Sequence, residues 1–271
     1  MQERVTPSPV APRADAALAD IAQGPALLAA VAPPTHAFFL DVDGTLLDLA
    51  PHPDAVEVPA ALPAALQALS VRAGGALALV SGRTVDRLDR LFAPLRLPVA
   101  GSHGAEIRAA PHGAVERAAP LDRDLVAALA QIARAHGGLF TEDKGPAFAI
   151  HYRARPELQR PLAAALAQLL AGREALALLP GHFVFEIKPA GRDKGSAIRA
   201  LLAQPPFAGR IPVFIGDDVT DEAGFAAATQ AGGLALAVGV PRAGAQAVLP
   251  GPAAVRDFLS RLAAEPQQHR R

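Results

Sequence analysis

The chain of 271 residues contains no cysteine, which excludes disulfide bonds, zinc–thiolate sites and thiol catalysis. Its formal net charge is zero and it has no block of basic residues, so it lacks the electrostatic footprint of a protein that binds nucleic acid or an anionic membrane. The signal-like run from Pro25 to Ala32 is too short to span a bilayer and follows acidic residues. We therefore expect a small-molecule partner, no nucleic-acid or membrane partner, no targeting signal and a cytoplasmic location.

Lysine is scarce in this sequence. Only three of the 26 basic residues are lysines, namely Lys144, Lys188 and Lys194, and the others are arginines. In a chain that uses arginine for general positive charge, the few lysines are candidates for positions that need a compact ammonium group. Chance is the alternative explanation for any one of them.

The arrangement of apolar segments predicts an α/β fold. Short buried-type runs alternate with helical patterns, as expected for a Rossmann-like parallel sheet covered by helices. These predicted strands cover residues 38–40, 76–80, 97–100, 211–215 and 234–238. In such a sheet, ligands bind at the carboxyl ends of the strands.

The middle of the chain has a different pattern. From Ala105 onwards, strands in hairpin-like pairs are interleaved with two amphipathic helices near residues 121–136 and 156–170, which predicts an inserted α+β unit. These strands are expected at about 105–109, 139–143, 147–153, 175–179 and 183–188. The division expected from this change is a core over 35–104 and 190–264 with an insert over 105–189. A proline-rich leader over 1–34, partly disordered, and a polar tail over 265–271 lie outside both.

The segment from Ala37 to Leu46 ends a predicted strand with Asp41, Asp43 and a glycine. Two acids at this spacing suit a nucleophilic carboxylate beside a general acid/base, with a divalent cation that reduces their repulsion. An ordinary Asp-Gly turn is the alternative. A calcium loop fails on spacing, because Leu46 and His52 stand where glycine and glutamate are required.

Two further strand ends and a helix start carry polar residues. Ser81 follows the second strand and precedes a helix that Thr84 is expected to cap, so its hydroxyl can bind a phosphoryl oxygen, although an ordinary strand-to-helix turn has the same pattern. His103, between glycines after the third strand, is a candidate to face the same opening. Lys194 follows the expected N-cap Asp193, where the helix dipole favours an anion nearby.

The fourth strand ends in an acidic cluster that contains Asp217, Asp218, Asp221 and Glu222. Four carboxylates within six residues repel one another unless a cation or hydrogen-bond donors compensate them. The cluster therefore predicts the second half of a metal site.

In their order along the chain, these motifs resemble those of the haloacid dehalogenase superfamily of phosphotransferases. The matching elements are DVDGT, Ser81, Lys194 and GDDVTDE. Within that superfamily, LDVDGTL, VSGR, GSHGAE, GRDKG and GDDVTDE are similar to the trehalose-6-phosphate phosphatases over residues 37–262. The less typical Val42 and Ser102 lie outside the acid–base set.

The resemblance implies a phosphatase reaction through an aspartyl-phosphate. In this scheme Asp41 attacks the phosphorus, and Asp43 protonates the leaving sugar oxygen and later activates water. Ser81 and Lys194 stabilise the equatorial phosphoryl oxygens.

The resemblance also implies a Mg²⁺ cofactor. Its ligands would be the Asp41 carboxylate, the Asp43 backbone carbonyl and Asp217. Asp218 and Asp221 would orient the metal-bound waters and Lys194.

The insert is expected to act as a cap that closes over the site and contacts the sugar. Strand alternation places Glu142 and Lys144 on one face, and likewise Glu186 and Lys188. The resemblance assigns Glu142, Lys144 and Glu186 to the disaccharide, while a solvated strand pair with cross-strand ion pairs is the alternative. Further predicted substrate contacts are Lys188, His103 and Arg83.

Several functions remain open at this point. The leading prediction is hydrolysis of trehalose 6-phosphate to trehalose and phosphate. Another sugar phosphate, such as sucrose 6-phosphate or mannosyl-3-phosphoglycerate, would need the same core motifs, and a phosphomutase is a further alternative. A non-catalytic sugar-phosphate sensor, or a regulatory partner of the synthase, belongs to a different class. The sequence gives no prediction of oligomeric state.

Overall fold

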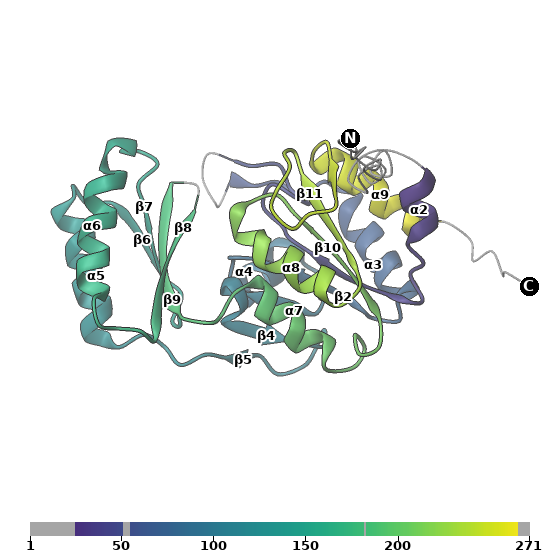
Figure 1. Ribbon diagram of the computed structural model, residues 1–271, viewed down its shortest axis with the longest axis horizontal. Coiled ribbons are helices and arrows are strands. Elements are labelled where there is room, and N and C mark those ends of the chain that lie inside the picture. Colours follow the sequence, from purple (N-terminus) through teal and green to yellow (C-terminus); the bar gives the residue numbers. More distant parts are fainter. Residues whose placement is uncertain (1–24, 51–54, 182, 265–271) are drawn as a thin grey trace, which may run out of the picture.

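The computed structural model describes residues 25–50, 55–181 and 183–264. Most of the predicted leader and the whole polar tail lie outside these residues. A short helix, α2 (Pro25–Ala30), opens the described chain and packs near the last helix, α9 (Pro252–Ala264). Figure 1 shows two parts side by side, a larger one built on an eight-stranded sheet and a smaller one built on a four-stranded sheet.

The large sheet has the order β12-β11-β10-β1-β2-β3-β4-β5, and its first six strands in this order are parallel. Its strands run apolar on both faces, as a parallel sheet covered by helices requires; the five residues of β1, for example, are all buried. The predicted parallel α/β core is confirmed. The bounds are β1 His36–Leu40, β2 Leu77–Val80, β3 Val99–Gly101, β4 Glu106–Arg108, β5 Glu116–Arg117, β10 Ile211–Gly216, β11 Leu234–Val238 and β12 Ala247–Leu249.

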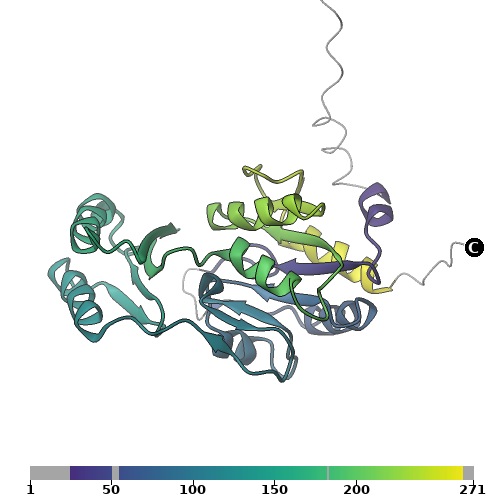
Figure 2. The same cartoon turned by 60° about the horizontal axis from the view of Figure 1, so that its bottom comes forward.

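Helices cover both faces of this sheet (Figures 1 and 2). One face carries α3 (Leu62–Arg72) and α9, which pack together, and the opposite face carries α7 (Lys194–Leu202) and α8 (Glu222–Gln230). Because β1 pairs with both β2 and β10, the chain winds in two directions from β1. In doubly wound folds this switch point opens the crevice where ligands bind.

The smaller part is an antiparallel sheet with the order β6-β7-β9-β8 and two helices. In Figure 1 the helices α5 (Arg123–Ala135) and α6 (Gln159–Leu170) cover the face that points away from the large sheet. They enclose a separate hydrophobic core with the sheet, so the predicted α+β pattern is present. The strands are β6 Phe140–Asp143, β7 Phe148–His151, β8 Leu176–Gly181 and β9 Val184–Pro189.

One strand was predicted correctly but assigned to the wrong part of the fold. The segment from Ala105 to Ala109, expected in the insert, forms β4, which pairs antiparallel with β3 of the large sheet and in turn with β5. The chain reverses directly after β3, so the shortest pairing available to β4 is with its neighbour. Glu106 and Arg108 are buried there because the Val85 N–H and the Asp89 carboxylate pair with them.

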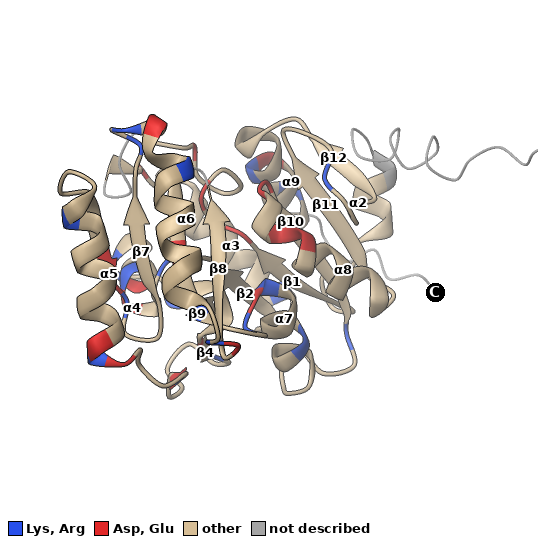
Figure 3. Ribbon diagram, turned by 60° about the vertical axis from the view of Figure 1, so that its left-hand side comes forward, with Lys and Arg blue, Asp and Glu red and all other residues tan. Residues whose placement is uncertain are grey.

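Among the helices of the described residues, none is long and apolar enough to cross a membrane. Figure 3 shows Lys and Arg interspersed with Asp and Glu over both parts of the fold. The cytoplasmic location stays a prediction.

Candidate active site

Three neighbouring strands bring polar residues to one edge of the large sheet. β1 leads into Asp41 and Asp43, β2 into Ser81, and β10 into Asp217. The Asp41 N–H donates to the Ile215 carbonyl at 2.9 Å, which continues the ladder past the end of β1. Sheet pairing alone therefore places Asp41 and Asp217, which are 176 positions apart in the sequence, beside each other.

The turn after β1 allows this edge to close. Gly44 has a φ of +81°, and a Cβ at this position would lie 2.1 Å from Asp217 Oδ2. Only glycine fits such an approach without displacing the carboxylate. The next residue, Thr45, is buried and donates its hydroxyl to Asp217 Oδ1 at 3.2 Å, so the DGT turn holds Asp217 in place.

Lys194 forms the centre of the site. Asp193 caps α7 by accepting the Ser196 N–H, which fixes the first turn of the helix. Lys194 Nζ donates to Asp41 Oδ1 at 2.7 Å and to Asp221 Oδ1 at 2.6 Å, and all three side chains are buried. Burial acts to lower the pKa of Lys194, but the carboxylates of Asp221 and Asp41 raise it above its ordinary value, so the ammonium stays charged.

The acidic loop after β10 is shaped by Asp221. Its Oδ2 accepts the N–H groups of Asp217 at 3.0 Å and Asp218 at 2.9 Å. Arg242 donates its Nε to the Asp217 carbonyl at 2.8 Å from the other side. Asp221 is therefore saturated by donors, while the Asp217 carboxylate points towards the end of β1.

Ligand oxygens of Asp41, Asp217 and Asp221 lie within 4.8 Å of one another. Burial raises the pKa of Asp41 to about 6 and that of Asp217 to about 8, and the negative charge of Asp41 adds to the effect on Asp217. Lys194 alone does not neutralise three carboxylates. The uncompensated charge and the all-oxygen donor set fit a hard divalent cation, for which Asp41 and Asp217 offer free lone pairs.

Asp43 lies beside this cluster with a different partner. Its two oxygens accept from Arg83 Nε and Nη2, each at 2.7 Å, in a bidentate ion pair. Ser81, which is buried, accepts the Arg83 N–H at 3.2 Å through its hydroxyl. Arg83 therefore links the ends of β1 and β2.

A cavity of about 460 Å³ opens between the two parts of the fold. Asp43, Arg83, His103 and Asp217 line it from the large sheet's side, and residues of the smaller sheet line it from the other side. The latter include Glu142, Lys144 and Glu186. The structure thus brings together almost all of the predicted substrate-binding residues.

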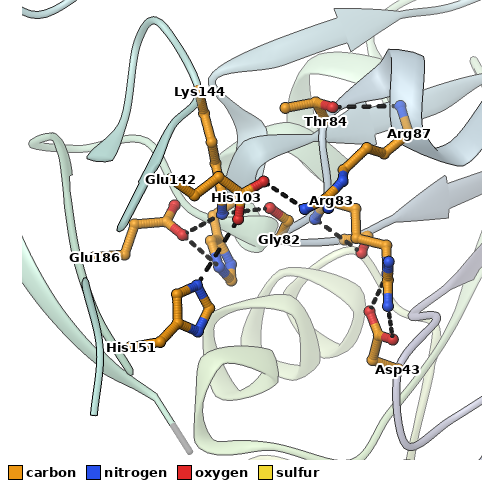
Figure 4. A network of polar contacts seen from close by, with 11 residues as sticks. Asp43, Gly82, Arg83, Thr84, Arg87, His103, Glu142, Lys144, His151 and Glu186 are labelled. Carbon is orange, nitrogen blue, oxygen red and sulfur yellow. Dashed lines mark hydrogen bonds and ion pairs between the residues drawn. The ribbon is translucent and has the colours of Figure 1, made fainter. Parts of the chain in front are cut away.

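Ionic contacts join the side chains of the smaller part to one another and to the large part (Figure 4). Lys144 Nζ donates to Glu186 Oε2 at 2.5 Å and to the Gly82 carbonyl at 2.9 Å. Glu142 accepts from Arg87 Nη1 at 2.6 Å. Buried Glu186 keeps one carboxylate oxygen, Oε1, without a hydrogen-bond partner, so an acceptor remains for a ligand donor.

His103 occupies the position expected for it, with a left-handed φ of 49°. Its Nε2 lies 3.9 Å from Glu186 Oε2, and Nδ1 has no hydrogen-bond partner. Burial lowers the pKa of His103 to about 3, so the ring is neutral near pH 7. A neutral imidazole has one N–H donor and one acceptor nitrogen, so it can hydrogen-bond to a sugar hydroxyl in either direction.

Lys188 is the predicted substrate residue that the structure does not bring to the cavity lining. It is buried, and its ammonium donates to the Arg192 carbonyl. Strand alternation predicted the correct face of β9 for Lys188, but the segment that follows the strand, which includes Arg192, covers the side chain.

Sequence reasoning missed several polar side chains of this region. Thr45 follows Asp43 within the same motif, and Thr220, in the cavity lining, lies within GDDVTDE, so both have a usable signal. The others stand in no local pattern that points to the site, and they include Arg87, His151 and Arg153 in the cavity lining and Arg242 against the acidic loop.

Comparison with known proteins gives a consistent assignment. Residues 39–246 match the trehalose-phosphatase family. The chain is 48% identical over 237 residues to a Sinorhizobium fredii protein named "Probable trehalose-phosphate phosphatase", with 84% of this chain and 87% of the relative covered. It is 40% identical over 238 residues to the Escherichia coli trehalose-6-phosphate phosphatase, with 87% and 89% covered.

The fold agrees with this relationship. The C-terminal domain of the Candida albicans trehalose-6-phosphate phosphatase superposes with a TM-score of 0.76 at 21% identity, covering 93% of this chain and 97% of that domain. At this identity the superposition shows a shared fold, and the sequence matches show the relationship. The chain therefore belongs to the trehalose-phosphatase family.

Proposed function

We propose that this chain hydrolyses trehalose 6-phosphate to trehalose and phosphate. The observation that carries the proposal is the buried Asp41–Lys194–Asp221 cluster, which lies beside Asp217 under a cavity lined by two cap carboxylates and a lysine. Family membership gives the reaction class, and the charged cavity suits a ligand with a phosphate at one end and hydroxyl groups at the other.

In the proposed reaction an Asp41 carboxylate oxygen attacks the phosphorus, and the bond from phosphorus to the sugar oxygen breaks. Asp43, half-exposed in the cavity lining, supplies the proton to that oxygen and later takes one from the hydrolytic water. Lys194 and Ser81 bind the equatorial oxygens. Donors of this type are worth roughly 3 kcal/mol each in the transition state.

We propose Mg²⁺ as the cofactor. Asp41, the Asp43 backbone carbonyl and Asp217 would hold it, and Asp218 and Asp221 would support them. Bound there, it would neutralise charge so that an anionic carboxylate can approach an anionic phosphate.

We further propose that the small sheet with α5 and α6 is a cap over a catalytic core, and that Glu142, Lys144 and Glu186 bind the disaccharide. Their carboxylate and ammonium groups can hydrogen-bond several hydroxyls, and a sugar that leaves them unpaired is rejected strongly. Arg83 and His103 complete the lining near the phosphate end.

The experiment that tests this function is phosphate release from a panel of substrates by wild type and Asp41→Asn. The panel contains trehalose 6-phosphate, sucrose 6-phosphate, glucose 6-phosphate and mannosyl-3-phosphoglycerate, each with and without magnesium. A strong preference for trehalose 6-phosphate that chelation and the substitution both abolish is the expected result. Equal or better turnover of another sugar phosphate would refute the cap assignment, and no turnover of any would favour a sensor.

A further inference from the structure

Glu142 of β6 and Lys144, which directly follows this strand, contact one short segment of the large part across the cavity. Arg87 Nη1 donates to Glu142 Oε1 at 2.6 Å, and Lys144 Nζ donates to the Gly82 carbonyl at 2.9 Å. Glu142 and Lys144 are two residues apart, and both line the cavity. Both partners lie in the stretch that directly follows Ser81, so the contacts connect the cap to the segment that carries the phosphate-binding hydroxyl (Figure 4).

Arg87 extends from a helix that is fixed to the sheet. Thr84 caps α4 (Val85–Leu91) by accepting the Arg87 N–H, and Glu106 accepts the Val85 N–H at 2.7 Å. Asp89 forms a bidentate ion pair with the buried Arg108, with both contacts at 2.6 Å. Because β4 holds α4 through these buried bonds, the Arg87 guanidinium starts from a rigid backbone.

Glu142 is held at one oxygen and available at the other. Arg87 binds Oε1, whereas Oε2 lies 3.8 Å from His151 Nε2 and the side chain is 17% exposed in the cavity. A carboxylate with one oxygen fixed presents the second in a defined direction, which reduces the entropy lost when a hydroxyl binds to it. Arg87 also lines the cavity, and in Figure 4 it lies on the far side of Arg83 from Asp43.

We propose that Arg87 is a positioning residue that holds Glu142, and with it the cap, over the cavity and thereby sets the affinity for the sugar part of the substrate. The inference rests on the proposed function, since it assigns Glu142 to the sugar. It goes further by making sugar affinity depend on an arginine of the core that is outside the proposed catalytic residues. A small phosphate ester without a sugar has no need of this contact.

The kinetic test compares Arg87→Gln with Arg90→Gln. Arg90 is an exposed residue on the same helix, so its substitution removes the same charge without touching the cap. Loss of a charge-assisted hydrogen bond in a partly buried position predicts a KM for trehalose 6-phosphate raised about tenfold or more in Arg87→Gln, with a smaller change in kcat. Arg87→Lys recovers most of the loss, and Arg90→Gln behaves as wild type.

Two further comparisons separate positioning from a general structural effect. The ratio of kcat/KM for trehalose 6-phosphate to that for p-nitrophenyl phosphate falls about tenfold in Arg87→Gln. Addition of Arg87→Gln to Glu142→Gln causes little further loss of kcat/KM, because Arg87 is proposed to act on the sugar through Glu142. A full additive loss in the double variant would overturn the proposal.

A physical measurement makes the inference independent of turnover. The chain has no cysteine, so Gln67→Cys on α3 and Gln168→Cys on α6, both exposed, provide unique sites for a fluorophore pair. Without substrate, Arg87→Gln is expected to lengthen and broaden the distance distribution between core and cap, and Arg90→Gln to leave it unchanged.

The outcomes distinguish the two proposals. If wild type hydrolyses no sugar phosphate, the proposed function fails, and the distance measurement still decides whether Arg87 holds the cap. If Arg87→Gln matches Arg90→Gln in both distance and KM, the inference about Arg87 is overturned. A longer distance with an unchanged KM overturns its link to sugar affinity.

Discussion

The substitution Gly44→Ala tests whether the turn after β1 sets the geometry of the acidic cluster. The new Cβ would lie 2.1 Å from Asp217 Oδ2 and 2.5 Å from its Cγ. Ordinary contact requires about 3.5 Å, so the Asp217 carboxylate has to move by about 1 Å or more. Displacement of a positioning group by that distance costs about 100-fold in rate.

A second effect of Gly44→Ala must be separated from the first. Alanine at a φ of +81° adds about 1–2 kcal/mol of backbone strain wherever it occurs. Gly209→Ala is the matched control, since Gly209 has a φ of +76° and no atom lies within 4 Å of its Cβ position. Both variants should therefore unfold a few degrees below wild type.

The assay is phosphate release from trehalose 6-phosphate over a magnesium titration, combined with thermal unfolding. Gly44→Ala should lose about 100-fold in kcat/KM and need more magnesium, whereas Gly209→Ala should keep its activity. Equal activities and equal magnesium dependence of the two variants would refute the claim that the Gly44 turn places Asp217.

Two other predictions follow from the charged residues. Lys194→Met leaves Asp41 and Asp221 buried without their cation, so the free energy of unfolding, measured with urea, should fall by about 3–5 kcal/mol. Phosphate release should fall about 100-fold or more. An unchanged free energy of unfolding would contradict the buried pairing. Although burial opposes the shift, the His151, Lys144 and Arg87 side chains lower the pKa of Glu142 from 4.5 to about 2. The Glu142 carboxylate therefore contributes stability that is present above pH 4.5 and is lost as the pH falls towards 2. Over this range the free energy of unfolding of Glu142→Gln should fall less than that of wild type. Parallel plots of the free energy of unfolding against pH for the two proteins would argue against the ion pair.

The core of the fold was predictable because its strands are apolar on both faces and end in recognisable turns. The predicted β11 coincides with the observed one, and Thr84 and Asp193 cap α4 and α7 as expected. By contrast, β4 carries Glu106 and Arg108, whose burial depends on partners in other elements. The alternation of residues in so short a polar strand does not reveal which elements its side chains pair with.

The candidate site was predictable to a similar degree. Asp41, Asp43, Ser81, Lys194 and Asp217 stand at the ends of strands or at a helix start, and parallel pairing alone brings such ends together. Their chemical roles stay predictions.

The residues that were missed or misplaced depend on tertiary contacts. Arg87 meets Glu142 across 55 residues of sequence, and Arg242 reaches Asp217 from a loop without a motif. Lys188 lies on the expected face of β9, but its ammonium donates to the Arg192 carbonyl. Side-chain direction at a covered edge is set by the chain that covers it, and the strand pattern carries no information about that chain.

The most direct test of the central claim is to quantify both products from trehalose 6-phosphate in the presence of magnesium. The account predicts free trehalose and inorganic phosphate in equal amounts, at a kcat/KM well above that for sucrose 6-phosphate, and neither product with Asp41→Asn. Phosphate release that persists in Asp41→Asn, or the absence of free trehalose, would contradict it.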